Sequence, residues 1–184
     1  MNGIMLMVEE HKLIKRMLNV VRKACYRALE TERINYDDFA EMIDFVRTYA
    51  DAHHHGKEEQ FLFNEMVAHA GPAAEKLVTH GMLVEHDLGR LHMAQLEVAL
   101  EAHKNGDAES ILDIIANAIS YTHLLYRHID KEDLVVYPFA ERTLNQEVID
   151  GINQACETFE NERVKDGVQD KYLHLVEKFE TKYL

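Results

Sequence analysis

A histidine followed four residues later by a glutamate occurs twice in this sequence, and each glutamate is preceded by a lysine and followed by another acid. The two copies are His54, Lys57, Glu58 and Glu59, and His128, Lys131, Glu132 and Asp133. Residues four apart lie one above the other on a helix, so each copy can direct an imidazole and a carboxylate toward one point. Two such faces brought together would form a cage for metal ions.

The two glutamates of the motif indicate that the cage holds cations. Glu58 and Glu132 fall in the apolar stripes of their helices, and a carboxylate buried without a positive partner is strongly destabilising. The preceding lysines point about 100° away around the helix and are poorly placed to supply that charge. Imidazole and carboxylate ligands suit Fe, Mn, Co and Zn, and bridging carboxylates can hold two ions with coordination positions left open.

Apolar residues at steps of three and four predict four long helices, at about residues 4–29, 38–67, 73–102 and 109–141. Gly71-Pro72 and Asn105-Gly106-Asp107 mark two of the turns between them. One histidine lies in the core stripe of each helix, and these are His11, His54, His86 and His128. Four core histidines in register favour a shared site over four separate buried side chains.

Helix lengths and composition predict an all-α fold, an up-down-up-down four-helix bundle with a C-terminal helical extension. The 184 residues include 2 prolines and 8 glycines, and no alternating run typical of a strand. We assign residues 1–142 to the bundle and residues 143–184 to the extension. The extension contains no cluster of metal-ligating residues, and we expect it to pack on the bundle or on a second subunit in a homodimer.

Charge and cysteine content exclude several classes of protein. The formal net charge is −13, and no basic stretch could follow a nucleic-acid backbone. Cys25 and Cys156 form neither a disulfide framework nor a thiolate metal motif. There is no run of ~18 apolar residues and no basic, cleavable leader. We therefore expect a cytoplasmic protein that binds neither nucleic acid nor membranes.

Other metal and hydrolase motifs are absent from the sequence. No glutamate is followed by a histidine three residues later, which disfavours the ferritin-like di-iron bundles. There is no His-Glu-x-x-His zinc motif, no Gly-rich phosphate loop and no Gly-x-Ser-x-Gly elbow. The chain therefore offers no visible nucleophile for hydrolysis.

The order of the motifs resembles that of the hemerythrin and HHE cation-binding family. It reads Glu10-His11, His54-x-x-x-Glu58, Glu85-His86-Asp87 and His128-x-x-x-Glu132. The resemblance implies a four-helix bundle with a non-haem di-iron centre that binds dioxygen or reacts with related small molecules. The implied ligands of the two irons are His11, His54, Glu58, His86, His128 and Glu132. Zinc or manganese would suit the same ligands in purified protein.

The chain departs from the classical pattern of this family on the third helix. A His-x-x-x-His pair is expected there, but Met82 and Arg90 stand four residues before and after His86. One imidazole of the classical five is therefore missing from that helix. His55 is the candidate for a fifth imidazole ligand from elsewhere.

Two further positions leave alternatives open. The classical fourth helix has an aspartate five residues after its histidine, so Asp133 competes with Glu132, and the repeat favours Glu132. Tyr121 lies two turns before His128 on the same face. Its hydroxyl either hydrogen-bonds a bound oxygen species or a ligand carboxylate, or it is a core tyrosine with an ordinary partner.

The sequence therefore predicts a di-iron protein that binds dioxygen or a related diatomic such as NO. With four predicted histidine ligands instead of five, a role in sensing, stress response or iron and redox handling is favoured over oxygen storage. The alternative is an enzyme-like protein that oxidises iron, reduces NO or repairs iron–sulfur clusters. A third alternative is a structural protein whose site holds zinc or no metal.

Overall fold

The computed structural model describes residues 1–184, which are helical almost throughout and contain no strand. The first long helix is α1 (Gly3–Thr31), and three further long helical rods follow, each built from several segments. The second rod contains α2 (Tyr36–Phe45), η1 (Val46–His55), η2 (Glu58–Phe63) and α3 (Asn64–His69). The third contains α4 (Gly71–Leu77), η3 (Val78–Met82) and α5 (Leu83–Lys104). The fourth contains η4 (Ala108–Ser110), α6 (Ile111–Lys131), η5 (Glu132–Val136) and α7 (Tyr137–Thr143).

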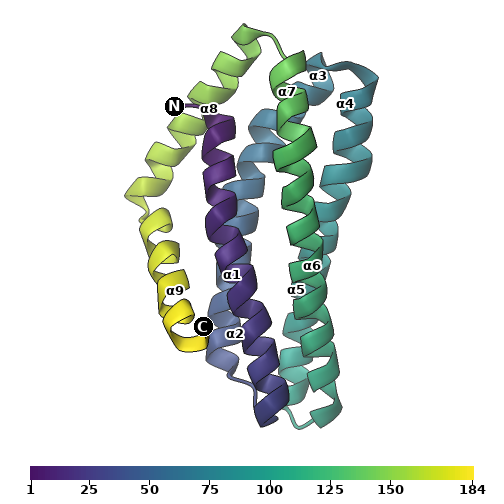
Figure 1. The fold of residues 1–184 in the computed structure, drawn as a ribbon, viewed down its shortest axis with the longest axis vertical. Helices are drawn as coiled ribbons and strands as arrows, with labels where there is room; N and C mark the ends of the chain where they lie inside the picture. Colours follow the sequence, from purple (N-terminus) through teal and green to yellow (C-terminus); the bar gives the residue numbers. More distant parts are fainter.

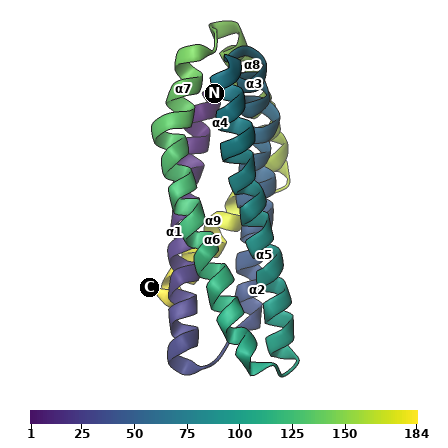
Figure 2. The same cartoon turned by 90° about the vertical axis from the view of Figure 1, so that its right-hand side faces the viewer.

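The four rods lie side by side and alternate in direction, and the predicted all-α four-helix bundle is confirmed (Figures 1 and 2). Two more helices, α8 (Gln146–Lys165) and α9 (Val168–Tyr183), form the C-terminal extension. The extension lies along the outside of the bundle, where α8 and α9 both contact α1 and the second rod (Figure 1). None of the helices is both long enough and apolar enough to cross a membrane.

The interior of the bundle consists of two apolar clusters with a polar layer between them. One cluster contains 26 buried residues and the other contains 14, and the extension contributes to both, through Phe179 in the larger and Ile152 in the smaller. Along α1 the order is Met7 in the smaller cluster, then His11, then Ile14 in the larger. The third rod has the same order along the sequence, and the second and fourth rods, which run in the opposite direction, have the reverse order. The histidines of all four rods therefore lie at one level of the bundle.

Several turns of the rods are wound as π-helix, in which backbone hydrogen bonds join residues five apart. Three of these segments contain predicted ligands: η1 ends with His54 and His55, η2 begins at Glu58, and η5 begins at Glu132. An ordinary α-helix would direct His54 and His55 ~100° apart. The wider turn brings their directions closer together, and both side chains are buried.

Close packing of the extension on α1 predicts the effect of a small substitution, Gly3→Ala. The added Cβ would lie 2.8 Å from Sγ of Cys156 on α8, and the Gly3 amide already donates a 2.8 Å hydrogen bond to Asn153. We expect the free energy of unfolding, measured by urea denaturation, to fall by about 1–3 kcal/mol. Gly81→Ala is the control, because its Cβ would meet nothing within 4 Å. Equal stability of the two variants would contradict this packing.

Candidate metal centre

Seven buried side chains from all four rods meet in the polar layer, in two groups that share Glu58. The three-histidine group contains His55, Glu58, His86 and His128, and the two-histidine group contains His11, His54, Glu58 and Glu132. Within each group the ligand atoms all lie within 4.8 Å of one another. The structure thus brings together all six residues proposed from the sequence. His55, the candidate for a fifth imidazole, lies with them.

The imidazole Nε2 atoms face the centre in closely spaced pairs. Those of His11 and His54 are 2.9 Å apart, and those of His86 and His128 are 3.0 Å apart. Two nitrogen ligands bound at ~2.1 Å to one ion, at right angles, would be separated by ~3.0 Å. The observed spacing therefore fits one metal ion in each group.

Each of the five imidazoles is held from behind by a carboxylate at its Nδ1 atom. The pairs are His11–Asp133 (2.7 Å), His54–Glu10 (2.8 Å), His55–Asp51 (3.3 Å), His86–Glu59 (2.7 Å) and His128–Glu85 (2.9 Å). We assign a proton to Nδ1 in each pair, because an ionised carboxylate can only accept. This arrangement orients Nε2 inward and is typical of histidines that bind metals.

The lysine in each copy of the repeated motif belongs to this outer layer of charge. The hydrogen bonds run from His54 and Lys57 to Glu10, and from His128 and Lys131 to Glu85. In each copy, the lysine therefore pairs with the acid that orients the histidine. It does not pair with the glutamate that follows it in the sequence.

The acid that follows each repeated glutamate supports a histidine on a different rod. Glu59 accepts a hydrogen bond from His86, and Asp133 accepts one from His11. Both acids are visible in the sequence as part of the motif, but their partners are set by the packing of the rods. The first and second rods thus repeat, approximately, the arrangement of the third and fourth.

Glu58 and Glu132 lie between the two groups and are completely buried. The two carboxylate oxygens of Glu132 lie 2.9 Å from Nε2 of His128 and 3.3 Å from Nε2 of His11, so this carboxylate spans both groups. Neither oxygen of Glu132, nor Oε2 of Glu58, has a hydrogen-bond partner. Buried carboxylate oxygens without donors are strongly destabilising, and bound cations would compensate them.

The charge balance of the centre also favours bound cations. Burial and the neighbouring Glu132 raise the pKa of Glu58 well above its usual range. Burial would also raise the pKa of Glu132, but the charge of His128 and the nearby His11 imidazole hold this pKa well below its usual range. Burial lowers the pKa of His54 to about 4, which keeps this imidazole neutral. Burial would lower the pKa of His128 as well, but Glu132 raises it to about 9. Without metal, protons therefore compensate the negative charge.

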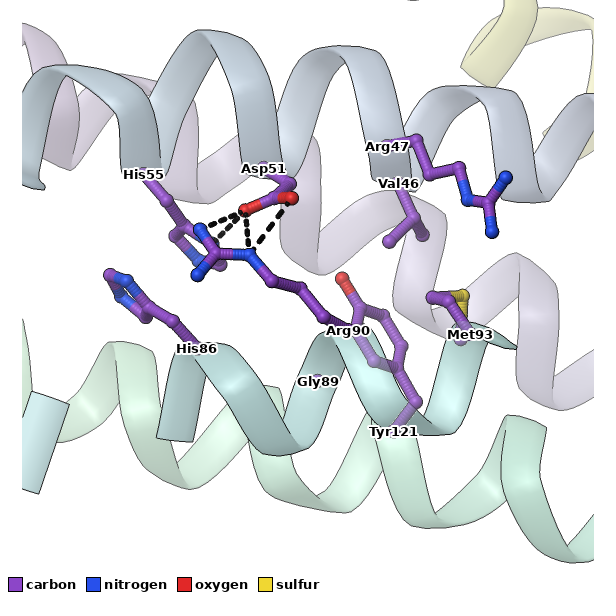
Figure 3. A pocket seen from close by; sticks show the side chains of 9 residues that line it. All are labelled: Val46, Arg47, Asp51, His55, His86, Gly89, Arg90, Met93 and Tyr121. Carbon is purple, nitrogen blue, oxygen red and sulfur yellow. Dashed lines mark hydrogen bonds and ion pairs between the residues drawn. The ribbon is translucent and has the colours of Figure 1, made fainter. Parts of the chain in front are cut away.

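A cavity of about 110 Å³ adjoins the three-histidine group (Figure 3). It reaches the rings of His55 and His86, which stack with their centroids 3.8 Å apart. Arg90 lines the cavity and forms an ion pair with Asp51, drawn as dashed lines in Figure 3, and another with Glu59. Arg90 thus supplies positive charge to both acids that orient the two stacked rings.

The tyrosine that contacts a ligand carboxylate is Tyr137, which is not among the residues predicted from the sequence. Its hydroxyl donates a 2.6 Å hydrogen bond to Oε1 of Glu58, and its ring stacks on His11. Tyr137 follows Glu132 by five residues, the spacing of the hydrogen bonds in a π-helical turn, and α-helical spacing does not reveal this relation. Tyr121 instead lines the cavity (Figure 3). Its hydroxyl forms no hydrogen bond with Glu58 or Glu132.

The remaining histidines lie outside the two groups. His53 is buried beside the extension, in a third cluster with Glu10 and Glu160. Glu160 lies in the C-terminal extension, which contributes this one residue to the cluster. The other six are exposed or half-buried: His69, His80, His92, His103, His123 and His174.

The fold and the site together define a class, the four-helix-bundle proteins whose cores can hold metal cations between histidines and carboxylates. The family model described as Hemerythrin HHE cation binding domain matches residues 2–140. The chain therefore belongs to the hemerythrin HHE cation-binding family, and the resemblance seen in the sequence is confirmed. Searches of the curated proteins and of the solved structures each gave no match.

The bridging position of the two buried glutamates predicts that Glu58→Ala combined with Glu132→Ala abolishes metal binding. We expect the metal content per chain, measured by elemental analysis, to fall to near zero, because both groups lose ligands. Added metal should then no longer raise the melting temperature. Glu9→Ala combined with Asp130→Ala, at exposed carboxylates, is the control. Unchanged metal content in the first variant would show that these residues are not the ligands.

The hydrogen bond from Tyr137 predicts that Tyr137→Phe destabilises the metal-free protein. Oε1 of the buried Glu58 would lose its donor, and we expect the free energy of unfolding to fall by about 1–3 kcal/mol. Tyr121→Phe is a matched control, because both tyrosines are 2% exposed but only Tyr137 bonds a carboxylate. Chemical denaturation of the chelator-treated proteins measures both effects. The prediction is contradicted if Tyr121→Phe lowers the free energy of unfolding more than Tyr137→Phe does.

Proposed function

We propose that this protein binds two iron ions in its bundle and uses them to bind dioxygen or a related small diatomic molecule. The observation that carries the proposal is the unequal number of imidazoles in the two groups. Both groups contain Glu58, and Glu132 lies near histidines of both, but one group has three imidazoles and the other has two. An ion with fewer protein ligands retains positions for an external molecule, whereas a fully ligated ion acts as a structural element.

The approximate repeat within the chain identifies which residue stands where the second group lacks an imidazole. His55 directly follows His54, and the residue that directly follows His128 is Ile129. Ile129 is 1% exposed and belongs to the larger apolar cluster. By the repeat, we infer that this aliphatic side chain borders the open side of the two-histidine group. Such a wall favours small, uncharged ligands over hydrated anions.

Iron is the proposed metal because it combines affinity for imidazole and carboxylate with redox activity. Bound iron would supply an exchangeable position and electrons for binding the diatomic. The argument against oxygen binding from a missing imidazole is also weaker, because His55 lies where it can supply a fifth imidazole. Dioxygen binding is therefore the first function to test, and NO is the second ligand of interest.

The test is metal analysis of protein purified without oxygen, followed by absorption spectra during cycles of O2 addition and removal. Two irons per chain with a spectrum that changes reversibly would support the proposed binding function. Irreversible oxidation with turnover of NO or peroxide would favour an enzyme instead. Stoichiometric zinc that does not respond to O2 would contradict both.

Ile129→His should convert the open group into a second three-histidine group. We expect this variant to keep two ions per chain but to lose at least about 90% of its reversible O2 or NO signal, because the added imidazole competes for the open position. Ile129→Leu, which preserves the apolar wall, is the control. Elemental analysis together with ligand-difference spectra measures both quantities. Full ligand binding by the histidine variant would show that the open position lies elsewhere.

A further inference from the structure

The C-terminal extension contributes a buried charge to the interior of the bundle. Glu160, on α8, is 6% exposed and forms an ion pair with Lys57, which is completely buried. Lys57 forms a second ion pair with Glu10. Glu10 in turn accepts the 2.8 Å hydrogen bond from Nδ1 of His54. A continuous chain of charged contacts therefore runs from the extension to a ligand of the two-histidine group.

Glu160 is itself fixed by neighbours on both sides. Gln169, in the first turn of α9, donates a 2.7 Å hydrogen bond to its second carboxylate oxygen. Nε2 of His53 lies 3.2 Å from Glu160 and 3.1 Å from Glu10. The Phe159 ring packs against that of His53, with centroids 5.5 Å apart. Both helices of the extension thus hold this carboxylate in place.

Lys131, the equivalent lysine in the second copy of the motif, is not covered by the C-terminal extension. Lys131 pairs with Glu85, as Lys57 pairs with Glu10, but its side chain is 48% exposed. No carboxylate from the extension reaches it. The extension therefore makes the two halves of the repeat different at this outer layer, and it does so on the side of the two-histidine group.

A third metal ion is not the best explanation of this cluster. The ligand atoms of Glu10, His53 and Glu160 do lie within 4.8 Å of one another. However, the ammonium group of Lys57 forms ion pairs with both carboxylates and already supplies positive charge there. A buried ammonium held by two carboxylates is a support for neighbouring groups, with little freedom to move.

We infer that Glu160 is a positioning residue for the metal ion bound by His11 and His54, and that it acts through Lys57 and Glu10. Because Lys57 is held on both sides, Glu10 stays aligned with Nδ1 of His54, and the imidazole keeps its Nε2 atom directed at the ion. Carboxylates behind metal-bound histidines typically change metal affinity by ~10–100-fold. The inference rests on the two-ion site proposed above.

The test is a cobalt(II) titration of the full-length, metal-free protein, followed by visible absorption. Two binding steps are expected, because the groups differ in imidazole number. Glu160→Gln should lower the cobalt affinity of one binding step by ~10-fold, the lower end of the range for a direct histidine partner, because it acts through Lys57 and Glu10. This is the step that His54→Ala abolishes, and the affinity of the other step should not change. Glu85→Gln, at the counterpart of Glu10 behind His128, should lower the cobalt affinity of the other step. Glu162→Gln, exposed on the same helix, is the control and should change neither.

The outcomes separate this inference from the proposed function. If the wild-type protein binds fewer than two cobalt ions, the two-ion function fails and the inference falls with it. If the wild type binds two ions and Glu160→Gln binds cobalt with the same two affinities, the inference alone fails. Equal weakening of both steps would show a general structural role and would also overturn it. If Glu160→Gln does not fold, Glu160→Asp, which keeps the charge but shortens the reach, should weaken the same single step.

Discussion

The structure depends on two carboxylates, Glu58 and Glu132, buried at the centre of a helical bundle with oxygen atoms that no protein donor satisfies. A bundle core normally excludes such groups, because desolvated charge without a partner is strongly unfavourable. Here the surrounding histidines turn their Nε2 atoms toward the same space instead of filling it with donors. The centre is therefore stable only with positive charge inside it, either as bound protons or as metal cations.

The layers of side chains around the centre alternate in charge, and each layer stabilises the one inside it. Inward imidazoles surround the space for the ions, five carboxylates hold the imidazoles, and lysines or Arg90 pair with those carboxylates. Every histidine ligand is thus fixed by a partner that is itself fixed. Apolar clusters on both sides exclude water, which strengthens these interactions and limits access to small molecules.

The bundle and most of the centre could be predicted from the sequence because they follow local periodicity. The repeated motif placed His54, Glu58, His128 and Glu132 correctly on facing helices. What could not be predicted depends on departures from the α-helix or on long-range packing. The π-helical turns at η1 and η5 bring His55 and Tyr137 inward, against ordinary helical spacing. Glu160 enters from a helix about a hundred residues away from Lys57, so no local pattern marks it.

Two breaks in the approximate repeat make its two halves different. A perfect repeat would supply both groups equally, and neither ion would differ from the other in reactivity. The His55 and Ile129 positions remove that equality at the ligands, and the cover of Lys57 by the extension removes it in the outer layer. Both differences act on the two-histidine group, which has the fewer imidazoles and the more deeply buried support. An ion with an open coordination position has fewer protein ligands and is bound less tightly. Its remaining histidines therefore gain most from groups that fix their orientation.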